Sequence, residues 1–281
     1  MSQNKTKCKK WFKELQNELC KTIENIERDF GSKAKFKSHK WKKGEYRIIN
    51  GDVIEKGGIA FSNVTGKFPK HFAHEIPGTK KNRNFWSSGV SVVLHPVNPK
   101  VPALHFNTRY IITSKSWFGG GIDATPCFSD AKLKKKFHSK LKLMCESHNK
   151  TYYKKYKKWC DEYFYLPHRN EIRGIGGIFF DYLNSEERRA MRSNARIYNN
   201  KNEEKIAIEN SFRKDFNFVK DVGLAFNNIV HEIIRHKMGE KYSKRDKDIQ
   251  LLKRGRYVEY NLLYDRGTKF GLNSGGNIDA I

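Results

Sequence analysis

The chain has 281 residues, enough for one large domain or two small ones with a sizeable core. Aromatic residues make up 13% of it, so the mean hydropathy of −0.79 reflects abundant lysine and argues against disorder of the whole chain. The formal charge of +26 predicts an anionic partner, which could be nucleic acid, an acidic membrane surface or a polycarboxylate substrate, unless the lysines serve only solubility.

The first predicted element is an amphipathic helix that ends near Gly31. Its apolar residues recur at three- and four-residue spacing: Trp11, Leu15, Leu19, Ile23, Ile26 and Phe30. Between Phe36 and Gly66, two β segments are separated by Asn-Gly and Gly-Gly pairs. Residues 87–110 then predict a β-hairpin, and residues 117–123 predict a glycine-rich loop.

The second half of the chain is predicted to be mainly helical. Residues 130–165 are helical by composition, and Ile178, Phe179 and Phe180 predict a buried strand after a glycine bend. Further helices are predicted over 185–194 and 203–238, and the end of the chain alternates like a strand before a turn at 265–267. This order predicts an α+β fold with an antiparallel sheet, in a single domain over 1–281.

The predicted hairpin gathers polar side chains on one face. Because successive strand residues point to opposite faces, Val92, Leu94, Leu104 and Phe106 lie on one side. The opposite side carries Ser91, His95, His105, Asn107 and Arg109. Such a face could simply be solvated, as is common for antiparallel sheets. Solvent-facing strands usually draw on Thr, Lys and Glu, however, so two histidines and an arginine favour a binding surface.

These residue types suit an acidic ligand. Histidine can deliver a proton near neutral pH, and arginine binds a carboxylate through two parallel hydrogen bonds. The glycine-rich segments FGGGID and RGIGGIFF lack both nucleotide-binding spacings, G-x-G-x-x-G and G-x-x-x-x-G-K-[ST]. We therefore expect these glycines to let the backbone approach a bulky, flat ligand.

The cysteines and the apolar segments bear on location. None of the five cysteines is spaced as Cys-x-x-Cys, which argues against a disulfide framework or zinc ribbon and indicates a reducing compartment. No segment approaches the roughly 18 apolar residues of a membrane span. The basic N-terminus lacks the apolar region of a secretion signal. We therefore expect a soluble, cytoplasmic protein with no membrane span.

Four segments together resemble one enzyme family. GVSVVLHPVNPKVPALHFNTRY, WFGGGIDATP, YKKWCDEYFYLPHRNEIRGIGGIFFD and EYNLLYDRGTKFGLNSGG are similar to motifs of oxygen-dependent coproporphyrinogen III oxidases, in the same order. The likeness runs from about Glu55 to the C-terminus. It implies oxidative decarboxylation of two propionates of coproporphyrinogen III to vinyl groups in haem biosynthesis, giving protoporphyrinogen IX, CO₂ and H₂O₂. Dioxygen is the implied co-substrate, and no organic cofactor is implied.

The resemblance also implies a fold, an assembly and site residues. The expected fold is a large antiparallel sheet flanked by helices on both sides, in a homodimer. His105 falls on the family's proton donor. Substrate contacts fall on Ser91, Asn107, Thr108, Arg109, Gly275, Gly276 and Asn277. The segment 257–281, read as a strand followed by a substrate segment, is expected to contribute to the dimer interface; an internal strand would look the same in sequence.

Four histidines fall on positions assigned to a divalent metal in bacterial members of the family: His95, His105, His138 and His168. Imidazole ligands would suit several transition metals, so neither the identity of the metal nor the need for it is fixed. His138 could instead be a residue on a helix surface. His105 cannot donate a proton through a nitrogen that ligates a metal, so its two implied roles need different states or nitrogens, or one is wrong.

Asp123 resembles the carboxylate that holds pyrrole N–H groups at the centre of the macrocycle. A carboxylate accepting such bonds could draw off a pyrrole proton and make the ring reactive toward dioxygen without a redox cofactor. The alternative is a loop cap. Arg266 could bind a propionate or pair with Asp265.

Three positions depart from the family pattern. Asn277 stands where arginine is common, Ala124 where leucine is usual, and Tyr182 where a second aspartate is typical. The chain also ends at Ile281, short of the expected tail.

Two other hypotheses remain open from the sequence. The charge and aromatic content would also suit a nucleic-acid-binding protein, but no recognition motif of that class is present, so we expect no nucleic-acid partner. A relative that binds tetrapyrroles without turning them over is the second, suggested by Asn277 and the short C-terminus.

Overall fold

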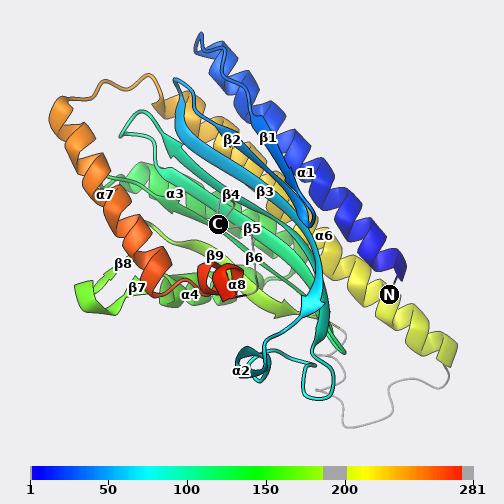
Figure 1. Ribbon diagram of the computed structural model, residues 1–281. Helices are drawn as coiled ribbons and strands as arrows, with labels where there is room; N and C mark the ends of the chain where they lie inside the picture. The colour runs from blue at the N-terminus through cyan, green and yellow to red at the C-terminus, as the bar shows by residue number, and fades with distance from the viewer. Residues whose placement is uncertain (1, 186–200, 274–281) are drawn as a thin grey trace.

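The computed structural model describes residues 2–185 and 201–273 (Figure 1). Its strands are β1 (Lys37–Trp41), β2 (Gly44–Ile49), β3 (Ile54–Lys67), β4 (Asn84–Pro96), β5 (Ala103–Ile112), β6 (Ser116–Thr125), β7 (Tyr165–Leu166), β8 (Glu171–Ile172) and β9 (Gly177–Leu183). Its α-helices are α1 (Ser2–Asp29), α2 (Lys70–Ala73), α3 (Ala131–His148), α4 (Tyr152–Tyr163), α6 (Lys201–Lys237), α7 (Lys244–Leu263) and α8 (Arg266–Asn273).

One antiparallel sheet of seven strands organises the fold, in the order β1-β2-β3-β4-β5-β6-β9. Helices α1 and α6 lie side by side across one face, and α7 lies over the other (Figure 1). Aromatic contacts join the first helix layer to the sheet: Phe106 of β5 stacks on Phe226 of α6 with ring centroids 5.0 Å apart. The predicted α+β class, with helices on both sides of an antiparallel sheet, is confirmed.

The N-terminal helix α1 matches its prediction except at its end. Leu15, Leu19, Ile23 and Ile26 are buried against the sheet and α6. Phe30 is 41% exposed, because the helix ends at Asp29 and Phe30 leaves its apolar stripe.

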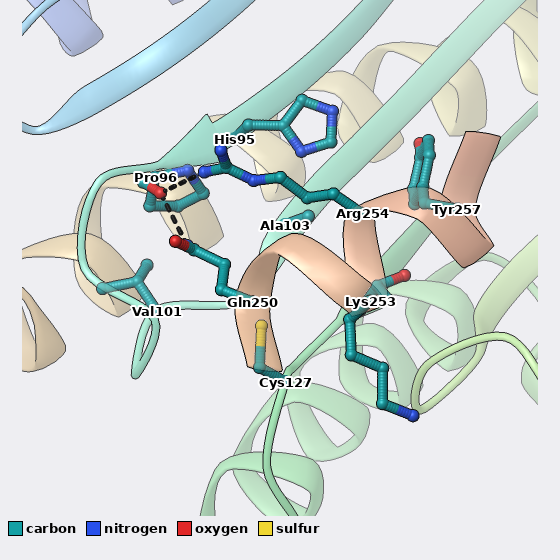
Figure 2. Close-up of a pocket in the computed structure, with 10 residues that line it drawn as sticks. His95, Pro96, Val101, Ala103, Cys127, Gln250, Lys253, Arg254 and Tyr257 are labelled. Carbon is teal, nitrogen blue, oxygen red and sulfur yellow. Dashed lines mark hydrogen bonds between the residues drawn. The ribbon is translucent and has the colours of Figure 1, made fainter. Parts of the chain in front are cut away.

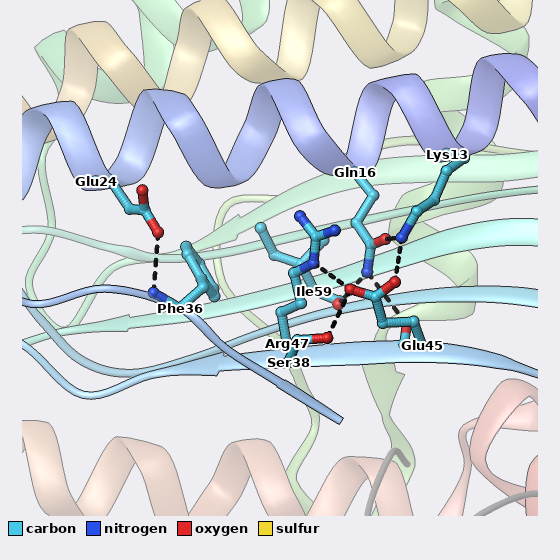
Figure 3. Close-up of polar contacts among 8 residues, drawn as sticks. All are labelled: Lys13, Gln16, Glu24, Phe36, Ser38, Glu45, Arg47 and Ile59. Atoms are coloured by element: carbon cyan, nitrogen blue, oxygen red, sulfur yellow. Dashed lines mark hydrogen bonds and ion pairs between the residues drawn. The ribbon is translucent and has the colours of Figure 1, made fainter. Parts of the chain in front are cut away.

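Two buried carboxylates fasten α1 to the sheet. Glu27 is fully buried and accepts hydrogen bonds from the backbone N–H groups of residues 52–54, which lead into β3. Glu45 of β2 is bound by Lys13 of α1 and by Arg47 (Figure 3). Burial alone would raise the pKa of Glu45, but these cations lower it to about 2. The helix is therefore fixed by paired charges as well as by its apolar stripe.

The predicted glycine-rich loop at 117–123 is wrong, because these residues belong to strand β6. Gly119, Gly120 and Gly121 are paired with β5 on one side, and β6 pairs with β9 on the other. A Cβ atom on Gly120 would lie 2.6 Å from the carbonyl oxygen of Asn107. The glycines therefore permit close strand packing, not a turn.

The predicted C-terminal strand is also wrong. Residues 244–263 form helix α7, which begins with a capping box between Ser243 and Asp246. Gln250, Tyr257 and Tyr260 are its buried residues, at a spacing that places them on one side of a helix. The alternation of YVEYNLLY is thus compatible with a helix that buries two tyrosines. The predicted turn at 265–267 coincides with the start of α8.

The other helices and strands agree with their predictions only in part. The region 36–66 contains three strands instead of two, and residues 130–165 form two helices, α3 and α4, separated near Asn149. The helix predicted over 203–238 is confirmed as α6. The strand at Ile178–Phe180 is confirmed within β9. The helix predicted over 185–194 lies almost wholly outside the described residues. No helix among 2–185 and 201–273 is both long and apolar enough to span a membrane.

Candidate active site

The sheet face opposite α1 and α6 carries the predicted polar set. The side chains of Val90, Val92 and Leu94 are buried toward the helices, so the alternate residues of β4 face the other way. Strand register aligns them in rows: Ser91 lies opposite Asn107, and Val93 lies opposite His105. Ser91, His95, His105, Asn107 and Arg109 therefore share one face, as predicted.

His105 and Asp123 form a hydrogen-bonded pair on neighbouring strands. They lie opposite each other on β5 and β6, with His105 Nδ1 2.5 Å from Asp123 Oδ2. Because Nδ1 is directed at the carboxylate, Nε2 is the ring nitrogen that points away from Asp123. It lies 3.5 Å from the Asn107 amide nitrogen. A carboxylate that fixes the tautomer in this way prepares imidazole for proton transfer.

Arg173, which precedes β9, holds the other side of Asp123. Its Nη2 donates to Asp123 Oδ1 at 2.7 Å, and both side chains are almost fully buried. The guanidinium lies over the rings of Phe164, Tyr257 and Tyr260, with its carbon 4.0, 4.2 and 4.7 Å from their centroids. Burial of Asp123 would raise its pKa, but Arg173 and His105 outweigh burial and leave the pKa below its ordinary value. Asp123 is therefore an anion at neutral pH.

Arg109 is oriented by a carboxylate from the edge strand. Its Nη2 donates to Asp181 Oδ2 at 2.7 Å, while about a third of its side chain remains exposed. Gly119 makes room for this pair, since a Cβ atom there would lie 2.6 Å from Asp181 Oδ1. The pair with Asp181 uses one guanidinium nitrogen, so the partly exposed side chain keeps further N–H groups that could bind an anion.

The other hairpin residues differ in how far their side chains are exposed. Ser91 is exposed, and the buried Asn107 Oδ1 has no hydrogen-bond partner among the described residues. An unpaired buried acceptor is costly, which suits a position that receives a donor from a ligand. Thr108 differs from the predicted set, because its side chain is 2% exposed on the helix-covered side. Its side chain cannot reach a ligand on the polar face.

Small residues make this face flat. Ala60, Ser91, Asn107 and Gly121 lie in one row across β3 to β6, and Gly89, Arg109 and Gly119 lie in the next. Gly89, Gly119 and Gly121 are buried, because neighbouring strands and the Arg109–Asp181 pair lie close to them, and a Cβ atom on any of the three would collide with these neighbours. These positions therefore add no bulky side chain to the sheet face between His105 and Arg109.

A separate small cavity lies where α7 meets the ends of β4, β5 and β6 (Figure 2). Gln250 and Arg254 each donate to the carbonyl of Pro96 at 2.8 Å and fix the helix there. The cavity measures about 10 Å³, which holds about one water molecule. It is much too small for a macrocycle.

The four histidines predicted as metal ligands have different surroundings. His138 is 8% exposed, and its Nε2 donates to the carbonyl of Ile175 at 2.9 Å, so the reading as a helix-surface residue is wrong. His168 contacts Glu259 and Tyr264. His95 packs edge-on against Tyr257, and burial lowers its pKa to about 4.

The four histidines do not meet in one chain. Within the described parts of the chain, no three His, Cys, Asp or Glu side chains form a group that could hold a metal.

The C-terminal candidates are only partly described. Asp265 accepts hydrogen bonds from Tyr163 and Thr268, which occupy its carboxylate. Arg266 is exposed and lies over the Tyr163 ring, with its guanidinium carbon 5.4 Å from the centroid. Of the two alternatives that the sequence left open, pairing of Arg266 with Asp265 is not formed within the described residues, and the exposed guanidinium is accessible to an anion. Gly275, Gly276 and Asn277 lie outside the described residues.

Sequence reasoning missed two residues of this site. Asp181 shares strand parity with Phe179, which lies opposite Gly121 on the polar face, so alternation along β9 could have indicated it. Arg173 carried no such signal, because its partner Asp123 is 50 residues away and the two meet only through the fold.

Comparisons with known proteins identify the family of this chain. The family model for coproporphyrinogen III oxidase matches residues 7–281. The chain belongs to the coproporphyrinogen III oxidase family. Curated relatives named oxygen-dependent coproporphyrinogen-III oxidase are 43% identical in Rickettsia akari (strain Hartford) and Rickettsia africae (strain ESF-5), over 99% of this chain and 95% of each relative. A relative of the same name from Rickettsia bellii (strain OSU 85-389) is 43% identical over 96% of this chain and 92% of that protein.

The match to the coproporphyrinogen III oxidase family covers more of the chain than the motifs do. The sequence suggested a resemblance beginning near Glu55, but the family match begins at residue 7 and includes α1. This agrees with the structure, in which α1 covers β3 and β4 and thus supports the strands that carry the site.

Proposed function

We propose that this chain catalyses the oxygen-dependent oxidative decarboxylation of coproporphyrinogen III to protoporphyrinogen IX in haem biosynthesis. Family membership over nearly the whole chain supports the reaction. The observation that carries its location is the His105–Asp123 pair beside Arg109 on a flat, glycine-lined sheet face. That face offers a proton-transfer group and a carboxylate-binding group to a planar polycarboxylate.

The stoichiometry of the reaction requires a proton donor, and the His105 imidazole is the candidate. Each propionate carboxylate, one O₂ and one proton give one vinyl group, one CO₂ and one H₂O₂. A proton must therefore enter at every turn, and His105 Nε2, with Asp123 behind Nδ1, is placed to deliver it. The reaction occurs at two propionates, so two O₂ are consumed and two CO₂ and two H₂O₂ leave.

Arg109 is the proposed grip for a propionate, because its exposed N–H groups can bind a carboxylate while Asp181 holds it in place. Asn107 Oδ1 is an acceptor without a hydrogen-bond partner in the described chain. It lies two residues along β5 from His105 and suits a pyrrole N–H group. Arg266 is the second proposed propionate contact, since Asp265 is engaged elsewhere. Ser91 offers an exposed hydroxyl in the same row as Asn107.

Asp123 acts, in our proposal, through His105. The resemblance implied that this carboxylate contacts pyrrole N–H groups directly. Asp123 is only 2% exposed, however, and His105 and Arg173 occupy its two oxygens. Its carboxylate would thus orient the ring through Nδ1.

Incubation with coproporphyrinogen III in air tests the function. The products are oxidised to porphyrins, separated and measured by fluorescence. We expect the dicarboxylate product and two CO₂ per substrate. A purified protein that binds the porphyrin but leaves the tetracarboxylate unchanged would instead be a binding relative without turnover.

We infer a homodimer in which α7 contributes to the interface. Leu251, Val258 and Leu262 are 54%, 52% and 63% exposed and lie on one stripe of that helix. An exposed apolar stripe of this kind supports association with a second copy. The inferred region overlaps the segment expected from sequence, although it is helical there.

Leu262→Glu is expected to convert the dimer to a monomer, because it places a charge in an apolar interface. Light scattering after size-exclusion chromatography measures the mass. Leu143→Glu on α3 is the matched control, since Leu143 is 76% exposed on another helix. Equal masses for wild type and Leu262→Glu would contradict the placement of the interface.

A divalent metal stays a prediction, and no step proposed above uses one. The histidines assigned to it already have separate hydrogen-bonding or aromatic partners. We expect exhaustive dialysis against a chelator to leave turnover unchanged within about twofold, in line with a mechanism carried by side chains. Activity lost on dialysis and restored by one divalent metal would overturn this expectation.

We also propose a cytoplasmic location. All five cysteines are free, and four of them are buried. Free thiols are usual in reducing compartments.

A further inference from the structure

A β-bulge at the edge of the sheet contains a strained aromatic residue. Gly120 pairs with Phe180 and Phe118 pairs with Leu183, so Asp181 and Tyr182 together oppose Gly119. Tyr182 has φ 52, in the left-handed region. Bulky side chains rarely adopt this conformation, whereas Asn tolerates it. The other left-handed non-glycine residue in the described chain is Asn170, with φ 50.

The bulge is part of the substrate face. Asp181 Oδ1 accepts the backbone N–H of Tyr182 at 2.9 Å, and Asp181 Oδ2 accepts from Arg109. One carboxylate therefore fixes both the strained backbone and the proposed propionate grip. Strain of this kind is commonly retained where it positions a functional group.

The Tyr182 side chain lies at the Arg109 end of this face. Its ring is tilted against Trp117, with centroids 5.7 Å apart, and the residue is 42% exposed. Arg109 and Arg266 both lower the pKa of its phenol, although burial and Asp181 raise it overall. Tyr182 directly follows Asp181, whose carboxylate binds both Arg109 and the Tyr182 backbone, so the bulge brings Tyr182 next to the Arg109–Asp181 pair. The phenol makes no hydrogen bond with any residue in the described ranges.

We propose that Tyr182 is a substrate-contacting residue whose phenol donates a hydrogen bond to a propionate carboxylate held by Arg109. The inference rests on the proposed function and deepens it. A phenol O–H beside a guanidinium complements a carboxylate, because one supplies a neutral donor and the other a charge. The exposed ring would also form an edge of the flat site. The strain is retained, on this view, because it presents the ring to the ligand.

Two variants distinguish a substrate contact by Tyr182 from a purely structural role of this residue. Tyr182→Phe keeps the ring and the backbone but removes the donor. We expect KM for coproporphyrinogen III and Kd for coproporphyrin III to rise roughly tenfold, with kcat little changed. Tyr182→Asn removes the ring but suits φ 52, so we expect Tm to rise by roughly 2–4 °C while binding weakens.

Tyr242→Phe is the control, since Tyr242 is 45% exposed and precedes α7. Unchanged KM and Kd in Tyr182→Phe would overturn the inference, as would a lower Tm in Tyr182→Asn, which would mark Tyr182 as structural. Wild-type protein without turnover would reject the proposed function instead. Fluorescence binding of coproporphyrin III still reads the Tyr182 contact in that case, because it needs no turnover.

Discussion

Replacing His105 with glutamine is expected to lower kcat for coproporphyrinogen III by roughly 10²–10⁴-fold, the usual contribution of a positioned proton-transfer group. Glutamine can still donate to Asp123 from its amide, so the buried carboxylate keeps a partner. KM should change little, because Arg109 and Asn107 remain. Initial rates of vinyl formation, measured by fluorescence of oxidised products, check this.

His231→Gln on the outer side of α6 is the matched control, because His231 is exposed and distant in sequence from the sheet residues. Circular dichroism and thermal melting should be similar for both variants and the wild type. A His105→Gln enzyme with wild-type kcat would remove this imidazole from the proton step.

Replacing Arg173 with methionine is expected to destabilise the protein by roughly 3–5 kcal/mol, because it leaves the buried Asp123 charge without its main cation. The loss should appear as a lower urea midpoint at an unchanged slope. Activity should also fall, since the pair that orients His105 loses its support. Arg169→Met is a control for arginine removal at an exposed site.

A second substitution and the dependence on pH distinguish whether Arg173→Met destabilises the protein through the lost charge or through lost packing. Arg173→Met/Asp123→Asn should recover part of the lost stability, because a neutral amide is less costly to bury than an unpaired carboxylate. The folded pKa of Asp123 is lowered, so its stabilising contribution is present at neutral pH. That contribution is lost as pH falls below about 4, the ordinary Asp range, and through the lower folded pKa. The stability difference between wild type and Asp123→Asn should therefore shrink in acid. Additive losses in the double variant would contradict the charge explanation.

Sequence patterns predicted the central hairpin well, because alternation fixes which strand residues share a face. Ser91 and Asn107 could be placed together before any coordinates, and the structure puts them opposite each other. The same rule put Thr108 on the helix side, against the role carried over from the family. Alternation thus located the Thr108 side chain, while a role of this residue toward a substrate stays a prediction.

Two kinds of information were missing from the sequence. Glycine runs are ambiguous: Gly119–Gly121 looked like a loop, yet neighbouring strands on both sides hold them in β6. Short aromatic alternation is also ambiguous, and α7 is a helix because Tyr257 and Tyr260 pack around Arg173. Both outcomes depend on tertiary contacts that no local window contains.

A crystal structure of the protein with coproporphyrin III tests the central claim most directly. We expect the macrocycle to lie on the glycine-lined face of β4, β5 and β6, with one propionate on Arg109 and another within reach of His105 Nε2. A macrocycle bound elsewhere, with Arg109 and His105 free of it, would contradict the account.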